Sequence, residues 1–291
     1  MSSEYPDEWD PLSEPPSKRY AKFNEVEGLK VWVEEDEKVL WIRFNRPHRL
    51  NAITQAGYNA LHGILDMLLL DRQIRVVVLS GEGKGFSSGL DFDSANKAPG
   101  PDHKTLFFNQ RKYSLLPLKF RTIPQPVISL MKGKIVGSGL AYALSADVRI
   151  ADPTLSISSG ANRMGLGGTD IALGWLLPRL CGWSATSEIL LTFRWLDAER
   201  CLRSGLVSTI VPADKLDDEG RKMAKDMLEL SHLGLIVTKM NLNAVAEGAS
   251  MRSAITAEDT AQIFAGSNPE AAVINERLKR NVQKGRVGSK I

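Results

Sequence analysis

Three short apolar runs constrain what this chain can fold into more than any other feature. They are VVVLSG at residues 76–81, PVISLM at 126–131 and VRIA at 148–151. A strand with one face in solvent alternates apolar and polar residues, whereas these runs are apolar almost throughout, so we expect both of their faces to be buried. Helix-like segments alternate with them. The sequence therefore predicts an α/β protein with buried central strands.

The flanking segments extend this pattern. Residues 29–45 read as two alternating strands joined by a turn at EEDE. Residues 54–70 place apolar side chains at steps of three and four, and residues 101–121 also look helical, so both segments are predicted helices. We therefore expect residues 22–210 to repeat β-β-α or β-α units. Helical patterns dominate residues 211–284, which we expect to form a C-terminal helical region.

The composition excludes several classes of function. The 291 residues carry 37 basic and 34 acidic side chains without a long block of one sign, which does not indicate a nucleic-acid surface. No apolar run approaches the ~20 residues that cross a membrane. Cys181 and Cys201 lack both C-x-x-C spacing and a nearby histidine, so we predict no metal site and no redox pair.

The two ends of the chain differ from the core. Residues 1–21 are acidic and proline-rich, so we expect a disordered tail there. They have neither a secretory nor an Arg-rich transit pattern. Residues 285–291 read as a flexible tail that ends in Ser289-Lys290-Ile291, one conservative change from the S-K-L peroxisomal address. We expect a peroxisomal location, with a cytoplasmic one as the alternative.

Two glycine-containing loops follow buried strands. They are GKGFSSGLDF at residues 83–92 and VGSGLAYA at 136–143. Backbone N–H groups at the start of a helix have no intrahelical partner, and a pair of them can hold a developing oxyanion. The sequence thus predicts an oxyanion hole built from two loops. The alternative is that these glycines serve only tight turns.

Two further motifs were weighed in the same loops. Residues 85–89 match the G-x-S-x-G of a serine hydrolase, with Ser87 as nucleophile, but a loop separates Ser87 from its strand, and the downstream His103 and His232 have no recognisable setting. Residues 136–143 fail the dinucleotide-binding pattern because Tyr142 stands where it requires a small residue. Neither motif is favoured.

Four stretches carry a resemblance to the crotonase superfamily, the enoyl-CoA hydratases and isomerases. They are FNRPHRLNAI, GFSSGLDF, PVISLMKGKIVGSGLAYALSADVRIA, and the segment from GWLLPRLCG to SEILLTFRWLDAERCLRSGLVSTIV, in the family's order. The resemblance implies a spiral of β-β-α units with a C-terminal helical region for trimer assembly. It also implies an acyl-CoA thioester as the ligand, with no cofactor apart from the coenzyme A of the substrate.

The resemblance assigns roles to residues of both loops. The oxyanion donors become the backbone N–H groups of Leu90 and Ser138, where the family usually has glycine at the second position. Removing a proton beside a thioester places negative charge on its oxygen, and two fixed donors lower that barrier by several kcal/mol. The remaining residues expected to contact the acyl-CoA are His48, Arg49, Leu50, Ser88, Gly89 and Gly137.

The acids depart from the family pattern. Hydratases of this family use two glutamates, and both positions read alanine here, Ala141 and Ala161. Asp170 matches an aspartate that some isomerases of the family place before the LPR segment, if one residue is inserted in GLGGT; otherwise Thr169 takes that position. Asp170 also precedes an apolar helical run, so a helix cap is the alternative role. An apolar surround that includes Leu166 is expected to desolvate the charged form of Asp170 and so raise its pKa.

These observations predict an acyl-CoA enzyme that moves a carbon–carbon double bond, with Asp170 carrying the proton. A single carboxylate suffices for such a transfer, whereas hydration normally recruits a second one for water. Two alternatives stay open: a hydratase, lyase or hydrolase of the same fold, and a catalytically silent acyl-CoA-binding protein. We expect a homotrimer or homohexamer, and neither nucleic acid nor membrane as a partner.

Overall fold

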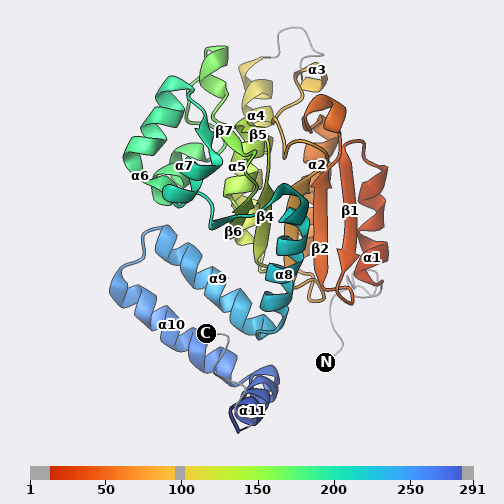
Figure 1. Cartoon of the computed structure of the whole chain (residues 1–291), viewed down its shortest axis with the longest axis vertical. Coiled ribbons are helices and arrows are strands. Elements are labelled where there is room, and N and C mark those ends of the chain that lie inside the picture. The colour runs from red at the N-terminus through yellow and green to blue at the C-terminus, as the bar shows by residue number, and fades with distance from the viewer. Residues whose placement is uncertain (1–13, 96–101, 284–291) are drawn as a thin grey trace. The chain divides into compact units, whose positions relative to one another are not determined.

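The computed structural model describes residues 14–95 and 102–283 (Figure 1). These residues form two compact units, which divide between Ala224 and Lys225. Residues 1–13, residues 96–101 and the tail with Ser289-Lys290-Ile291 lie outside the described residues. Within the described part of the chain, no helix has the length and apolar character needed to cross a membrane.

Within the described residues, six strands of the first unit form one sheet in the order β1-β2-β3-β4-β6-β9. The first two strands are antiparallel and the others join in parallel. Every residue of the third and fourth strands is buried, which confirms that the central strands have two covered faces. The strands are β1 (Leu29–Glu34), β2 (Val39–Phe44), β3 (Val76–Gly81), β4 (Val127–Met131), β6 (Val148–Ala151) and β9 (Thr209–Ile210).

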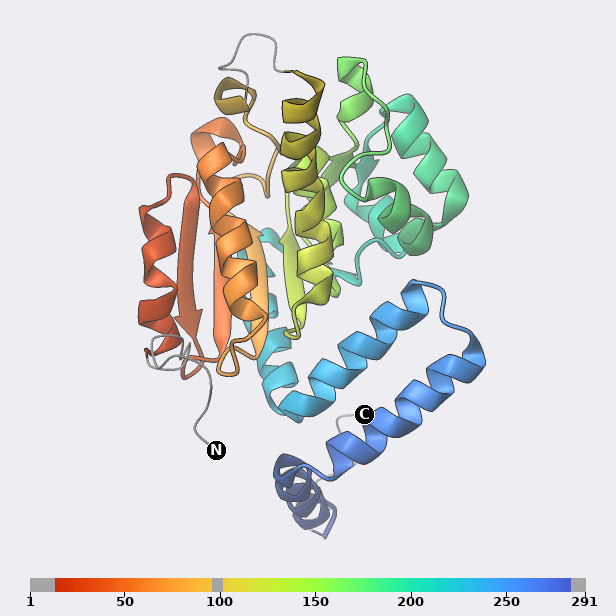
Figure 2. The ribbon, with the colours of Figure 1, turned by 180° about the vertical axis from the view of Figure 1, so that it is seen from behind.

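Helices cover both faces of this sheet. On one face lie α2 (Gln55–Leu68) and α4 (His103–Thr122), the two helices predicted from apolar spacing (Figure 2). On the other face, the start of α8 (Leu216–Leu228) is tied to the sheet by ion pairs between Arg43 and Asp217 at 2.5 Å and between Arg221 and Glu34 at 3.0 Å.

A second, three-stranded sheet follows the order β5-β7-β8. Strands β4 and β6 of the large sheet are each followed by a strand of this small sheet and then by a helix, so the β-β-α repeat is confirmed. The strands of the small sheet have only two or three residues, too few to show a period in the sequence. The elements are β5 (Lys134–Val136), α5 (Gly137–Leu144), β7 (Ser156–Ser158), α6 (Leu173–Thr192), β8 (Leu196–Asp197) and α7 (Ala198–Arg203).

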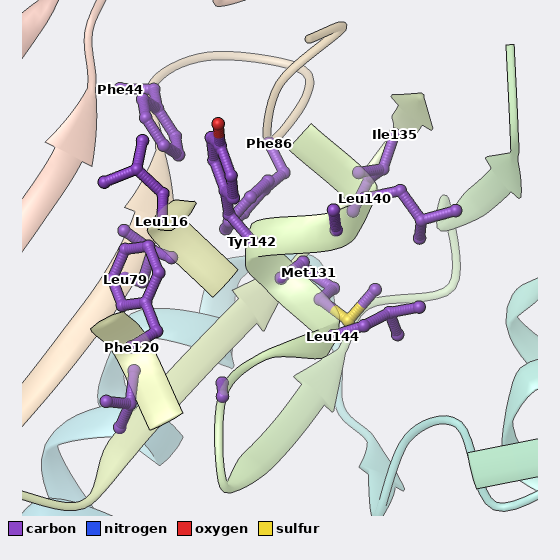
Figure 3. Packing of buried hydrophobic residues seen from close by; sticks show 14 of the residues in the cluster. Phe44, Leu79, Phe86, Leu116, Phe120, Met131, Ile135, Leu140, Tyr142 and Leu144 are labelled. Carbon is purple, nitrogen blue, oxygen red and sulfur yellow. The ribbon is translucent and has the colours of Figure 1, made fainter. Parts of the chain in front are cut away.

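The core lies between the large sheet and the helices α2, α4 and α5. Figure 3 shows its aromatic side chains gathered around Tyr142 of α5. The rings of Phe44 and Phe86 meet edge to face at 5.4 Å, and the ring of Phe120 lies 6.0 Å from that of Tyr142. Tyr142 is a buried residue of a core helix, which explains why the dinucleotide pattern fails at this position.

Short elements connect these larger ones. They are α1 (Pro16–Arg19), α3 (Phe92–Ala95) and the 3₁₀ turns Ala21–Glu25, Pro47–Arg49, Ala161–Met164 and Ala213–Lys215. Helix α6 is broken at Gly182, whose φ of 75° and ψ of 171° are not helical.

The second unit is helical, in keeping with the expected character of residues 211–284. It contains α9 (His232–Ala246), α10 (Met251–Gly266) and α11 (Pro269–Gln283). Helices α9 and α10 line an open groove of about 690 Å³, whose lining includes Met240 and Phe264. Both of these side chains are more than half exposed, as are those of Met251 and Ile263.

The expectation of a disordered tail through residue 21 is wrong for residues 14–21. The side chain of Arg19 forms a 2.5 Å ion pair with Asp71, and the hydroxyl of Tyr20 donates to the same carboxylate at 3.0 Å. Arg19, Tyr20 and Asp71 are all buried. The proline-rich composition did not reveal this anchor, because its acidic partner lies 52 residues further along the chain.

We predict that Arg19→Met lowers the free energy of unfolding by about 3 kcal/mol, because it leaves the carboxylate of Asp71 buried without its cation. Lys18→Met removes an exposed cation from the same short helix and is expected to change that free energy by less than about 0.5 kcal/mol. Urea unfolding at pH 7 measures both variants. Equal stability of the two variants would contradict the anchoring role of Arg19.

Candidate active site

The loop that follows β3 is held by the segment that precedes α2. The N–H of Ser88 donates to the carbonyl of Leu50 at 2.9 Å, and the N–H of Ile53 donates to the carbonyl of Gly89 at 2.7 Å. Ile53 and Leu90 form a parallel bridge. Gly89 has a φ of 85°, which turns the chain at this point. These contacts fix the backbone around the predicted donor Leu90.

Asn51 clamps this loop, a role that the motif comparison did not assign to it. Its buried side chain donates to the carbonyl of Glu82 at 2.8 Å and to that of Gly85 at 2.7 Å, while its oxygen accepts from the N–H of Arg46 at 2.8 Å. The only sequence signal was its place in the stretch FNRPHRLNAI. Within that stretch, the sequence predicts acyl-CoA contacts at residues 48–50 only, whereas Asn51 holds the loop itself.

An ion pair supports the far end of the same loop. Asp91 is buried and lies 2.6 Å from the guanidinium of Arg46. Burial acts to raise the pKa of Asp91, but the hydrogen bond and the charge of Arg46 outweigh it, so the pKa lies below its usual range. The carboxylate therefore stays ionised and keeps Arg46 against the loop.

The second loop leads from β5 into α5. Gly137, the first residue of α5, has a φ of 56°, and its N–H donates to the carbonyl of Ser159 at 3.1 Å. The residue before it, Val136, gives the helix no side-chain cap. The next N–H group, that of Ser138, lies at the helix start, where no residue four positions earlier in the helix can accept from it.

The two loops approach each other at the predicted donors. A Cβ atom added to Gly89 would lie 3.2 Å from the nitrogen of Ser138 and 2.8 Å from the carbonyl oxygen of Val136. One added to Gly139 would lie 2.5 Å from the carbonyl oxygen of Ser87. Among the backbone hydrogen bonds of the described residues that run outside single helices and strands, none is donated by the N–H of Leu90 or of Ser138. Glycine is therefore required at both positions for the close approach of the two loops that carry the predicted donors.

Ser87 is not placed to act as a nucleophile. It is fully buried, and its hydroxyl donates to the carbonyl of Asn51 at 2.8 Å. The same oxygen accepts from the N–H of Gly89 at 3.1 Å. Ser87 thus shapes the loop, and the structure does not favour the serine hydrolase alternative.

The residues expected to contact CoA form an exposed turn beside this loop. His48, Arg49 and Leu50 are exposed, and Leu50 has a left-handed φ of 50°. Arg49 forms an ion pair with Asp93 and lies 3.8 Å from Asp91, so its charge is partly matched by carboxylates. The structure brings this turn next to Ser88.

Asp170 lies between α4 and the start of α6. Gln110 of α4 donates to its Oδ1 at 2.5 Å, and the N–H of Ile171 donates to the same atom at 2.8 Å. In the part of the chain that the structure describes, Oδ2 has no hydrogen-bond partner. Thr169 lies elsewhere: its side chain packs near Gly174, where an added Cβ would meet it at 3.1 Å.

The alternative role of Asp170 as a helix cap is wrong. It does not cap α6 with its side chain, because the capping position falls on Ala172 and no side chain bonds there. The left-handed φ values of Ile171 and Ala172, 44° and 66°, turn the chain into the helix instead. The expected apolar surround is also incomplete, since Leu166 is 60% exposed and Asp170 itself is half-buried.

A cluster of tyrosines lies close to Asp170 and to the second loop. Burial raises the pKa of Tyr58 and Tyr142 well above the usual tyrosine range, and the negative charge of Asp170 raises both further. Both hydroxyls therefore stay protonated at neutral pH. Ala141 and Ala161, which replace the family's glutamates, are buried. The sequence did not single out Gln110 as the partner of Asp170.

No group of three or more histidine, cysteine or acidic side chains gathers as a metal site among residues 14–95 and 102–283. The two cysteines are unpaired, and burial raises the pKa of the Cys201 thiol to about 12. The groups that these residues offer are therefore a carboxylate, protonated hydroxyls and the two predicted N–H donors.

Comparisons with known proteins agree with this class of fold and site. The chain is 36% identical over 231 residues to a probable enoyl-CoA hydratase of Mycobacterium tuberculosis, covering 78% of this chain and 81% of that protein. It is 28% identical to a 1,2-epoxyphenylacetyl-CoA isomerase of Escherichia coli, covering 81% and 89%. An enoyl-CoA hydratase candidate of Thermobifida fusca, solved in complex with CoA, superposes with a TM-score of 0.76 at 28% identity, covering 84% and 95%.

The fold and the site thus define a crotonase-fold enzyme linked to acyl-CoA. The family model for enoyl-CoA hydratase/isomerase matches residues 34–277. The chain belongs to the enoyl-CoA hydratase/isomerase family.

We predict that Gly139→Ala separates the two loops, because the new methyl group cannot occupy a point 2.5 Å from a backbone oxygen. The free energy of unfolding is expected to fall by about 1–3 kcal/mol. Gly167→Ala is the matched control, since nothing lies within 4 Å of its added methyl group. Thermal or urea unfolding compares the pair, and a Gly139→Ala variant as stable as the control would show that the loops do not pack this closely.

Proposed function

We propose that this enzyme shifts a carbon–carbon double bond of an enoyl-CoA thioester by proton transfer. The observation that carries the proposal is the asymmetric setting of Asp170. Two donors hold Oδ1 in place, while Oδ2 is left to take and return a proton. Ala141 and Ala161 stand at the two positions where the resemblance places the glutamates that hydratases of this family use.

The chemistry follows from these residues. Asp170 removes a proton from the carbon chain, and the electron pair moves toward the thioester oxygen. The N–H groups of Leu90 and Ser138 stabilise the negative charge on that oxygen, for which donors of this kind contribute about 3–4 kcal/mol each. Asp170 then returns the proton to a different carbon. The similarity to an isomerase as well as to a hydratase supports this reaction class.

A hydratase, lyase or hydrolase of the same fold is the second candidate, and the hydratase relative supports it. Asp91, the other acid that acts on Tyr58, is held by Arg46, so in the described residues the free oxygen of Asp170 would have to serve both water and carbon. Reaction in ¹⁸O-labelled water separates these candidates, because only the second puts labelled oxygen in the product. A silent acyl-CoA-binding protein would bind the CoA thioesters and turn over none.

We predict that Asp170→Asn lowers kcat for isomerisation of a 3-enoyl-CoA by a factor on the order of 10³ or more, because the amide cannot accept the proton. Asn can still accept the hydrogen bonds that fix Oδ1, so the loop is retained. Thr169→Val is the matched neighbour and is expected to keep kcat within about twofold of the wild type. Initial rates over a panel of 2-enoyl-, 3-enoyl- and dienoyl-CoAs measure both.

Full activity of Asp170→Asn would remove Asp170 from the mechanism. Loss of activity in Thr169→Val with an active Asp170→Asn would instead transfer the role to Thr169.

We also propose a homotrimer or homohexamer, supported by the exposed apolar side chains of α9 and α10. Phe264→Asp places a charge on this surface, and burying a charge in an interface is costly. The variant is expected to sediment as a species close to the chain mass of 32.0 kDa, whereas Glu258→Lys, on the same helix, is expected to keep the wild-type assembly. A monomeric wild type would contradict the proposal.

For location, the mycobacterial relative supports the cytoplasmic alternative over the peroxisomal one. Imaging of the tagged protein in its own cells tests this.

A further inference from the structure

Ser138 carries a hydroxyl group that an oxyanion hole made of backbone N–H groups does not use. Its Oγ lies 2.7 Å from the hydroxyl oxygen of Tyr58, and the two share a hydrogen bond. Ser138 is 2% exposed and Tyr58 is fully buried. A buried hydroxyl pair of this kind is costly to break, because each partner would be left without a hydrogen bond.

Tyr58 is held firmly by its neighbours. Its ring lies 4.6 Å from that of Tyr113 and meets the ring of Tyr142 edge to face at 6.2 Å. The hydroxyl of Tyr142 donates to the backbone carbonyl of Tyr113 at 3.1 Å. The hydroxyl of Tyr113 accepts from the side chain of Gln55. Packing therefore fixes the position of the Tyr58 hydroxyl at hydrogen-bond distance from Oγ of Ser138.

One short segment of chain reaches both halves of the hole. Ile53, just before α2, bridges the backbone of Leu90. Tyr58, in the first turns of α2, holds the side chain of Ser138. Thr54 is the N-cap of α2, and its side-chain oxygen accepts from the N–H of Gly57 at 3.1 Å. This cap keeps residues 54–57 in the first turn of the helix. Residues 53–58 therefore act as a spacer between the two predicted donors.

We propose that Tyr58 is a positioning residue of the oxyanion hole: its hydroxyl holds Ser138 through Oγ and, together with the Ile53 bridge, sets the separation of the two N–H donors. The proposal rests on the proposed function only in assuming that a thioester oxygen binds between Leu90 and Ser138. A displacement near 1 Å in such a site costs on the order of 100-fold in rate. Tyr58 acts without touching the substrate.

Infrared spectroscopy of a bound thioester tests this without turnover. The probe is hexanoyl-CoA with ¹³C at the thioester carbonyl, which is saturated and has no double bond to move. Hydrogen bonds from the hole shift the carbonyl stretch of the wild-type complex to lower wavenumber. Tyr58→Phe keeps the ring and removes the hydroxyl, and Ser138→Ala keeps the N–H and removes Oγ. Each variant is expected to lose the same part of the shift.

The double variant decides how Tyr58 acts. If Tyr58 works through Oγ of Ser138, Tyr58→Phe with Ser138→Ala loses no more of the shift than either single change. Additive losses would overturn the proposal, because Tyr58 would then act by another route. Tyr113→Phe is the matched control: it removes a hydroxyl from the same cluster that bonds to Gln55, and the full shift is expected.

Kinetics give a second readout. Tyr58→Phe is expected to lower kcat on the order of 10-fold with KM within about twofold, since a misplaced donor affects the charged transition state more than binding. A fall in thermal stability with unchanged kcat would show a merely structural role and contradict the proposal.

A wild type without a shift of the carbonyl stretch would show that the oxyanion hole does not bind the thioester oxygen. An active Asp170→Asn beside an intact shift would refute the isomerase mechanism and leave the role of Tyr58 standing.

Discussion

The close contact between the loop after β3 and the start of α5 is the constraint on which the rest of the site depends. Gly89 lies so close to Ser138 that a methyl group at Gly89 would crowd its nitrogen, and Gly139 lies as close to the carbonyl of Ser87. The parallel sheet makes this possible, because β3 and β4 are neighbours, so the loop after β3 and the β5–α5 segment that follows β4 start from the same edge of the sheet. Two backbone N–H groups are thereby left without acceptors at one point, and Asn51, Ser87 and the bridge of Ile53 to Leu90 keep them there.

Much of the fold follows from pattern. The apolar runs of β3 and β4 require that both faces of the sheet are covered. The helical patterns of α2 and α4 indicate two of the helices that cover it. The small sheet could not be predicted this way, because strands as short as β8 carry no period. The anchor of Arg19 on Asp71 was missed for another reason: a buried ion pair between distant residues leaves no local trace in a proline-rich segment. The structure, by contrast, shows it directly.

The candidate site divides in the same way. Glycine loops after buried strands indicated two N–H donors, since that inference needs only local backbone geometry. The resemblance to a family singled out Asp170, but its partner comes from α4, where Gln110 lies 60 residues before Asp170 in the sequence. From the sequence, an apolar surround was expected, and a helix cap was the alternative role. The structure shows a polar anchor on one oxygen and a left-handed turn at Ile171 and Ala172. The tyrosines near Ser138 were equally invisible, because aromatic residues at helical spacing are typical of any core.

The central claim is that one carboxylate and two backbone donors face the same thioester. A crystal structure of the enzyme with a bound saturated acyl-CoA tests it most directly. The account predicts that the thioester oxygen accepts hydrogen bonds from the N–H groups of both Leu90 and Ser138, at about 2.7–3.1 Å, and that Oδ2 of Asp170 faces the carbon chain. A thioester oxygen bound away from these two groups, or an acyl chain that leaves Asp170 in solvent, would contradict it.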